Sequence, residues 1–113
     1  MDFTLSKEQQ MARTLFRDFA EKEVKPYAQE LDEEERFPSE ALEKLRKYKF
    51  MGIPYPKEWG GAGCDNLTYT ICIEEISKVC ATTSTMLSAH ESLGTWPIYK
   101  FGTQQQKEKY LKK

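Results

Sequence analysis

Residues 54–63, "PYPKEWGGAG", decide between two fold classes, because a glycine-rich segment either cradles a phosphate or turns the chain. A dinucleotide-binding fingerprint needs GxGxxG directly after a β-strand, and a P-loop needs Lys and Ser or Thr after its last glycine. Here Gly60, Gly61 and Gly63 follow a helical segment and a proline-rich loop, and no such lysine follows. We therefore expect the glycines to supply positive φ in a tight connection between helices, with Trp59 packed over it.

The sequence before this stretch predicts a long first helix. Ser6 and Gln9 form a capping box, so the helix should begin at Lys7. Pro26 should end or kink it, because proline lacks an N–H group and its ring clashes with the preceding turn. The apolar residues that recur at helical spacing are Met11, Ala12, Leu15, Phe16, Phe19 and Ala20. This stripe is the expected core face of the helix.

Two more helices are expected before the glycine-rich stretch. A short one begins near Tyr27, and its acidic continuation over residues 32–36 is typical of a solvated face or loop. The next begins at Pro38, whose fixed φ suits the first helical position, and Gly52 should end it. Its expected buried side consists of Leu42, Leu45 and Tyr48.

Helical patterns also follow the glycine-rich stretch. Asp65 or Asn66 should cap a helix that is buried on more than one side. The side chains on those sides are Leu67, Ile71, Cys72, Ile73, Glu75, Ile76 and Val79. The next helix should span residues 82–93 and end at Gly94, and Pro97 should open a short segment after it.

No strand-like alternation persists anywhere, so the predicted fold is all-α. We expect about six helices in a bundle-like or orthogonal arrangement, forming one domain over residues 1–113. The 17 basic and 18 acidic residues nearly cancel, leaving a formal charge of −1, which argues against a nucleic-acid partner. No apolar run approaches the roughly 18 residues of a membrane span, and the N-terminus lacks signal-peptide features. The expected location is therefore the cytoplasm.

Cysteine and histidine, the usual ligands of a zinc site, are scarce in the sequence. Cys64, Cys72 and Cys80 lack CxxC spacing, and His90 is the single histidine. We therefore predict reduced thiols, with neither a disulfide nor a metal site, and a packing or surface role for His90. The serines expected to be small helix-packing residues, since no triad partners accompany them, are Ser84, Ser88 and Ser92.

Two long segments carry a resemblance to a known family. Residues 50–69, FMGIPYPKEWGGAGCDNLTY, and residues 73–111, IEEISKVCATTSTMLSAHESLGTWPIYKFGTQQQKEKYL, together resemble the N-terminal helical domain of the acyl-CoA dehydrogenases. Within that family the chain is most similar to bacterial short-chain enzymes, the butyryl-CoA dehydrogenases. The specific signal is the glycine-loop phrase combined with the ending SLG…PI…FG…QK.KYL at its spacing, since either part alone would be weak.

The resemblance implies a flavin-dependent oxidoreductase. Such enzymes have an N-terminal helical, a middle β and a C-terminal helical domain, and they usually form tetramers. A glutamate removes the α-proton of a fatty acyl thioester, and a hydride passes from the β-carbon to FAD. The reduced flavin then passes electrons to an electron-transferring flavoprotein.

The resemblance places the catalytic glutamate in the C-terminal domain and most flavin contacts in the middle and C-terminal domains, which residues 1–113 lack. We therefore expect no catalytic residue here, and Glu74, Glu75 and Glu91 are not candidates for the base. The isolated chain should be inactive and bind FAD weakly or not at all, and no cofactor-binding residue is assigned. Faces that the family buries between domains should be exposed, so self-association or marginal stability is expected.

The resemblance also implies where a short-chain acyl-CoA would touch this domain. Alignment on SLG carries the acyl-tail positions of the family onto Thr85, Met86, Ala89 and Leu93. In a regular helix these positions share one face with residue 82. Met86 could form the floor of the pocket, and Ala89 replaces a glutamate found in some longer-chain members.

Two other interpretations stay open at this stage. An apolar stripe at helical spacing is usually ordinary core, so the acyl-tail positions could be packing residues. The chain could also be a freestanding helical binding or assembly module without redox chemistry, or a helical scaffold made for structural study. A downstream β domain followed by a glutamate-bearing helical domain would decide for the enzyme.

Overall fold

The structure, a computed structural model, describes residues 1–112, and these residues contain helices but no β-strand. The α-helices are α1 (Lys7–Phe19), α2 (Lys25–Glu34), α3 (Ser39–Lys47), α4 (Asn66–Ser77), α5 (Ala81–Ala89), α6 (Trp96–Phe101) and α7 (Gln104–Tyr110). The shorter elements are two π-helical turns, η1 (Ala20–Val24) and η4 (His90–Thr95), and two 3₁₀ turns, η2 (Phe50–Gly52) and η3 (Lys57–Trp59). The predicted all-α fold is confirmed.

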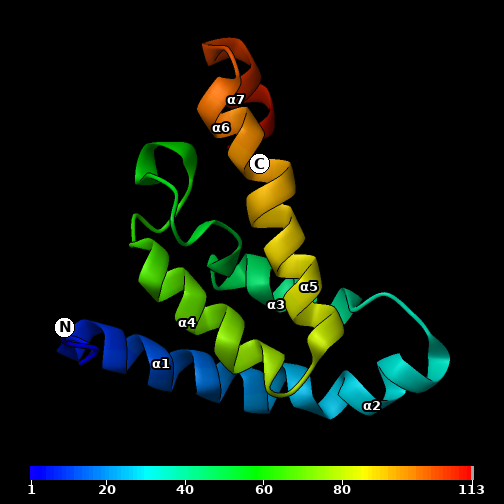
Figure 1. Ribbon diagram of the computed structural model, residues 1–113. Helices are drawn as coiled ribbons and strands as arrows, with labels where there is room; N and C mark the ends of the chain where they lie inside the picture. The colour runs from blue at the N-terminus through cyan, green and yellow to red at the C-terminus, as the bar shows by residue number, and fades with distance from the viewer. Residues whose placement is uncertain (113) are drawn as a thin grey trace.

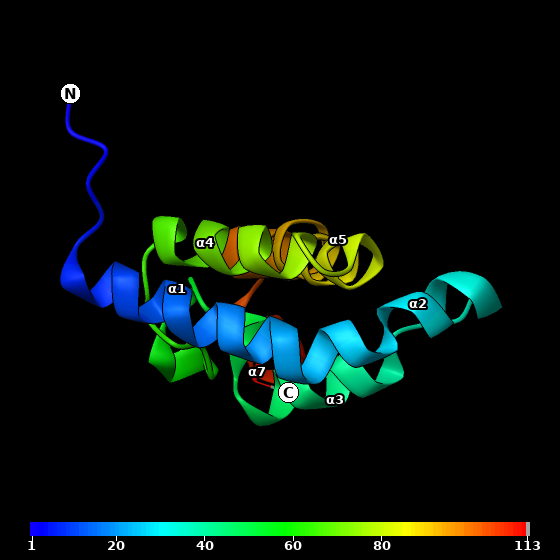
Figure 2. The same ribbon diagram turned by 90° about the horizontal axis from the view of Figure 1, so that it is seen from below.

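The helices of the body form two layers. Helices α4 and α5 make one layer, and it lies over α1, α2 and α3 in the other (Figure 2). Beyond the body, α6 and α7 form an arm that continues the direction of α5 (Figure 1). The predicted caps start these helices where expected, since Ser6 and Gln9 form the capping box of α1 and Asp65 caps α4.

The core lies between the two layers. The rings of Phe16 and Phe19 in α1 meet that of Phe50 edge-on, with centroids 5.1 and 5.2 Å apart. Other fully buried side chains are Val24, Leu45, Ile53, Ile71, Cys72, Ile76 and Leu87. Met11 and Leu15 were expected in the same stripe but are 72% and 54% exposed. The described elements cover only part of that stripe, because α4 packs along one side of α1.

Pro26 does not end the first helix. Helices α1 and α2 are joined through η1 into one rod (Figure 1), and the amide of Lys25 donates to the carbonyl of Ala20, five residues back. In a regular α-helix the ring of Pro26 would clash with the carbonyl of Lys22, four residues back. The wider π turn just before the proline removes that clash, so the helix continues.

Gly94 likewise does not end the fifth helix, contrary to the prediction. Helix α5 continues through η4 into α6, and the amide of Trp96 donates to the carbonyl of Glu91. Here too the π turn ends two residues before a proline, Pro97. The helix therefore continues through both positions where a break was expected. Helices α1 and α2 form one rod and α5 and α6 another, so the seven α-helical segments make five continuous helices rather than about six.

The third helix differs from the prediction at both ends. Pro38 occupies the N-cap rather than the first helical position, and α3 ends at Lys47 rather than at Gly52. The reversal of the chain is made by Lys49, which adopts a left-handed conformation with φ of 62°. Tyr48 therefore lies past the helix and is 45% exposed instead of buried. Gly52 instead allows a close approach of two backbone segments, because a Cβ atom at this position would lie 3.3 Å from the Cα atom of Gly61.

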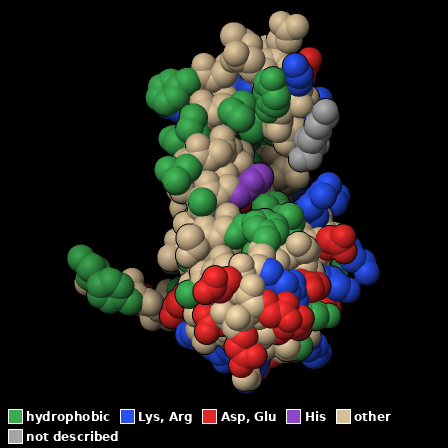
Figure 3. Space-filling view, turned by 90° about the vertical axis from the view of Figure 1, so that its right-hand side faces the viewer, with side chains coloured by type: hydrophobic (Ala, Val, Ile, Leu, Met, Phe, Trp, Pro, Cys, Tyr) green, Lys and Arg blue, Asp and Glu red, His purple; other side chains and the backbone are tan. Residues whose placement is uncertain are grey.

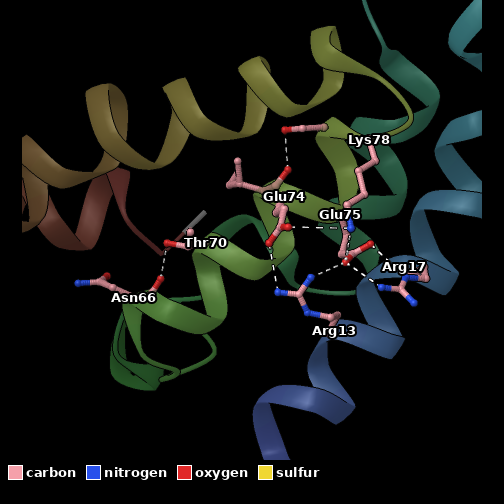
Figure 4. A network of polar contacts seen from close by, with 9 residues as sticks. Arg13, Arg17, Asn66, Thr70, Glu74, Glu75 and Lys78 are labelled. Atoms are coloured by element: carbon pink, nitrogen blue, oxygen red, sulfur yellow. Dashed lines mark hydrogen bonds and ion pairs between the residues drawn. The ribbon is translucent and has the colours of Figure 1, made fainter. Parts of the chain in front are cut away.

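A buried carboxylate joins α1 to α4. Glu75 has a side chain that is only 1% exposed, and it accepts from Arg13 at 2.9 Å, from Arg17 at 3.3 Å and from Lys78 at 3.1 Å (Figure 4). Burial alone would raise the pKa of Glu75, but the hydrogen bonds from Arg17 and Lys78 outweigh it and hold the pKa below its ordinary value. With Ile71 and Cys72 also buried, the expectation that α4 is buried on more than one side is confirmed.

We predict that Glu75→Gln lowers the free energy of unfolding by about 2–3 kcal/mol, because two arginines lose their buried counter-charge. Chemical denaturation of the 113-residue chain measures this. The matched control is Glu74→Gln, since Glu74 pairs with the same Arg13 but is 51% exposed, and its loss should stay below about 0.5 kcal/mol. Equal losses for the two variants would contradict a special role for the buried carboxylate.

Candidate functional site

The glycine loop, residues 60–64, has all of its amides paired with carbonyls of the segment just before it, residues 52–57. The amides of Gly60 and Gly61 donate to the carbonyls of Lys57 and Pro56, at 3.0 and 3.1 Å. Those of Ala62, Gly63 and Cys64 donate to the carbonyls of Gly52, Tyr55 and Ile53, at 2.9, 2.8 and 3.0 Å. A phosphate-binding loop needs free amides that point at the ligand. These residues therefore do not fit the pyrophosphate of a dinucleotide, and the glycines turn the chain as predicted.

Two of the glycines have the positive φ that was expected, and a third allows a close backbone approach. Gly60 has φ of 88° and Gly63 has φ of 70°. A Cβ atom on Gly61 would lie 2.1 Å from the carbonyl oxygen of Tyr55 and 2.7 Å from that of Gly52. The loop is thus pressed against the segment that carries Tyr55, and only glycine at position 61 permits this.

We predict that Gly61→Ala lowers the free energy of unfolding by roughly 2–4 kcal/mol, because the new methyl group meets rigid backbone rather than a flexible side chain. The control is Gly94→Ala, whose Cβ would have no neighbour nearer than 4.0 Å. That variant should be neutral or more stable by up to about 1 kcal/mol, since alanine favours helix over glycine. Thermal or urea unfolding compares them, and a tolerated Gly61→Ala would refute the close-packing role.

The glycine loop positions Tyr55 against the η4 turn. The ring of Tyr55 is buried, and its hydroxyl donates to the carbonyl of Glu91 at 2.5 Å. That carbonyl also accepts the π-turn hydrogen bond from Trp96. Burial, followed by the charge of Glu91, raises the pKa of Tyr55 to about 12, so the phenol stays protonated and keeps donating. Sequence reasoning missed this contact because its two residues are 36 positions apart and neither belongs to a motif.

Helix α5 presents different residues on its two sides. The side that faces α4 carries Thr83, Ser84 and Leu87, all buried. Ser84 is a packing residue, as expected, and its hydroxyl lies 2.5 Å from that of Ser77 in α4. The other side of α5 therefore remains available for contacts outside the described elements.

The four predicted acyl-tail residues fall into two groups. Thr85, Met86 and Ala89 lie in α5, where Thr85 is exposed, Ala89 is half-buried, and Met86 is half-buried against the core. Leu93 lies in the η4 turn and is 76% exposed. The wider π turn changes the angular spacing after Ala89, so the regular periodicity that placed Leu93 on the same face does not continue through η4.

The other residues considered in the sequence do not assemble into a catalytic group. Glu74 and Glu75 belong to the ion pairs with Arg13, and Glu91 is buried in η4. His90 is exposed on the same turn, consistent with a surface histidine. Within residues 1–112, no group of three or more His, Cys, Asp or Glu side chains lies close enough together to hold a metal ion. Across the same residues, no helix has the length and apolar character to cross a membrane.

The arm and the η4 turn carry a concentration of exposed apolar surface. Its large apolar side chains are about half exposed or more: Leu93 (76%), Trp96 (46%), Phe101 (80%) and Tyr110 (56%). Figure 3 shows apolar side chains along the arm, whereas charged side chains gather on the body. Beside η4, an open hollow of about 880 Å³ lies between the end of α3, the glycine loop and α7. Exposed apolar surface of this kind usually contacts another protein segment or a ligand.

Comparison with known proteins decides the family. The family model described as "Acyl-CoA dehydrogenase, N-terminal domain" matches residues 6–113. The chain belongs to the acyl-CoA dehydrogenase family. Over 111 residues it is 56% identical to the "Acyl-CoA dehydrogenase, short-chain specific" of Clostridium acetobutylicum, which covers 98% of this chain and 29% of that protein. The resemblance inferred from the sequence is thereby confirmed.

Solved structures show the same domain fold. The butyryl-CoA dehydrogenase of Megasphaera elsdenii matches with a TM-score of 0.89 and 37% identity, covering 98% of this chain and 30% of that one. A chain of the structure described as the electron-transferring flavoprotein of Acidaminococcus fermentans matches with a TM-score of 0.93 and 43% identity, covering 99% and 30%. This member of the acyl-CoA dehydrogenase family thus spans about three tenths of the length of these relatives.

Proposed function

We propose that this chain is the N-terminal domain of an FAD-dependent short-chain acyl-CoA dehydrogenase. The whole protein would catalyse α,β-dehydrogenation of a short-chain acyl-CoA, pass the electrons to an electron-transferring flavoprotein, and assemble as a tetramer. The observation that carries this proposal is the match over nearly the entire chain to a short-chain-specific relative. The similarity to a butyryl-CoA dehydrogenase favours a short acyl group, and the Acidaminococcus fermentans structure favours the flavoprotein partner.

FAD, when bound by the whole protein, would accept the hydride from the β-carbon of the substrate. We assign no contact with it to the glycine loop, because the amides of that loop are already paired with carbonyls of residues 52–57. In the family the catalytic glutamate and most flavin contacts lie in the two later domains. The 113 residues by themselves are therefore proposed to be inactive and to hold little or no flavin.

The contribution of this domain is a surface for the acyl tail. Thr85 and Ala89 are one turn apart on the side of α5 that does not face α4, and both are small enough to leave room for an alkyl chain. Each methylene that this surface removes from water contributes roughly 0.8 kcal/mol to binding. By excluding water from the tail, the domain favours binding of the substrate without taking part in proton or hydride transfer.

Met86 sets the depth of the proposed acyl pocket. Its side chain is half-buried and packs against the core, so one end is anchored in the domain while the rest remains accessible. A side chain held in this way can close the end of a cavity. Leu93 is a weaker member of the pocket, because it lies past the change of helical spacing in η4.

We predict that the purified 113-residue chain is colourless after addition of FAD and removal of the free cofactor, because its residues offer no phosphate site in the glycine loop. Visible absorption with and without FAD and butyryl-CoA measures this. A stoichiometric bound-flavin spectrum would refute the proposal that the flavin contacts lie elsewhere.

In a full-length dehydrogenase that carries this domain, we predict that Met86→Ala shifts preference toward longer acyl chains. Two extra methylenes buried in the deepened pocket should raise the ratio of kcat/KM for hexanoyl-CoA over butyryl-CoA by about tenfold. Met51→Ala is the matched control, because Met51 is also half-buried against the core but lies outside α5. Equal ratios for the two variants would reject Met86 as the pocket floor.

A further inference from the structure

The η4 turn contains a buried carboxyl group that the proposed function does not use. Glu91 is 2% exposed, and neither of its carboxyl oxygens has a hydrogen-bond partner in the described chain. The backbone amide of Ile53 lies near enough to lower the pKa somewhat, but it makes no hydrogen bond of acceptable geometry with the carboxyl group. Glu75, the other buried glutamate, differs because it pairs with two arginines and a lysine.

The titratable side chains that respond to the charge of Glu91 lie on two segments, the one that carries Tyr55 and α4. Tyr55 approaches from the glycine-loop segment, and Tyr69 and Cys72 come from α4. The pKa values of all three are raised, by burial first and also by the charge of Glu91. On its own turn, partial burial of the exposed His90 lowers the pKa of that imidazole below its ordinary value of 6.5, so at pH 7 the ring is mainly neutral.

This setting favours the uncharged acid. An ionised carboxylate in an apolar site without a cation or hydrogen-bond donor is strongly unfavourable. Burial accordingly raises the pKa of Glu91 to about 8, from an ordinary value of 4.5. In the folded domain Glu91 is therefore protonated at neutral pH.

We infer that Glu91 is a proton-dependent switch for the η4 turn: the turn stays closed over the neutral carboxyl group and opens when that group ionises. The inference concerns the fold of this chain and does not depend on the proposed function. Its geometric basis is that the same residue holds the turn together. The backbone carbonyl of Glu91 accepts both the Trp96 amide and the Tyr55 hydroxyl, so a movement of the turn's backbone that takes the carboxylate to water disrupts both hydrogen bonds.

Opening of the η4 turn would change both the surface proposed to bind the acyl tail and the position of the arm. Ala89 precedes η4 and Leu93 lies within it, so the residues proposed to contact the acyl tail would move with the switch. The arm of α6 and α7 would also lose its fixed direction, because η4 is its connection to α5. Alkaline pH would thus loosen the acyl-binding face and the arm together.

The direction of the pH dependence follows from proton linkage. The folded state keeps the proton on Glu91 up to about pH 8, whereas the unfolded chain releases it near its ordinary pKa of 4.5. The contribution of Glu91 to stability is therefore complete below pH 4.5 and is lost progressively as the pH rises to 8. A glutamine at this position resembles the neutral acid and cannot ionise.

The experiment compares urea unfolding of the 113-residue chain and of Glu91→Gln between pH 5 and 8.5. We expect the two to differ least at pH 5, and the folded-to-unfolded ratio of Glu91→Gln, relative to that of the parent, to grow by roughly a hundredfold or more between pH 5 and 8.5. Glu58→Gln, which alters an exposed glutamate, should follow the parent at every pH. Curves for Glu91→Gln and the parent that run parallel across the range would overturn the inference.

Two further measurements use chains that retain Glu91, so they test the inference even if Glu91→Gln fails to fold. Carboxyl ¹³C NMR should show one glutamate titrating near pH 8, and a set of glutamates that all titrate near 4.5 would overturn the inference. In a Trp59→Phe background, the fluorescence of Trp96 should change with the same midpoint as that glutamate, because Trp96 follows the turn directly. Fluorescence that stays constant through the carboxyl titration would show that the turn does not open.

Discussion

The hydrogen bond from the Tyr55 hydroxyl to the Glu91 carbonyl connects the segment before the glycine loop to the η4 turn. On one side, Tyr55 is held by the glycine loop, which packs so closely that position 61 has no room for a Cβ atom. On the other side, the carbonyl belongs to the π turn through which α5 continues into the arm. This contact therefore ties the glycine loop to the turn that connects the arm with the surface around Ala89.

Prolines explain why the long helices contain π turns. Both η1 and η4 end two residues before a proline, Pro26 in one rod and Pro97 in the other. A widened turn removes the clash between the ring and the carbonyl four residues back, at the cost of irregular hydrogen bonding. In η4 the carbonyl of Glu91 accepts hydrogen bonds from both the Tyr55 hydroxyl and the Trp96 amide, which links the turn to the candidate site.

The two buried glutamates show how environment gives opposite properties to the same side chain. Glu75 lies between α1 and α4 with arginines and a lysine around it, and its charge helps to hold the layers together. Glu91 lies among tyrosines and a thiol without a cation, so it remains an uncharged acid. The periodicity of α4 placed Glu75 among buried positions, but no sequence pattern indicated the burial of Glu91.

The sequence by itself determined the features that depend on neighbouring residues. The capping box of Ser6 and Gln9, the turn chemistry of Gly60 and Gly63 and the all-α fold could be predicted, because caps, turns and helical faces follow from residues a few positions apart. The family was recognised from the resemblance of two long segments rather than from these local patterns. Only the tertiary structure decided that Pro26 and Gly94 lie inside continuous rods, that Gly52 and Gly61 make a close approach, and that Tyr55 reaches Glu91. The contact between Tyr55 and Glu91 joins residues 36 positions apart, and the rods continue because of π turns that no sequence pattern indicated, so packing outweighs local preference at these positions.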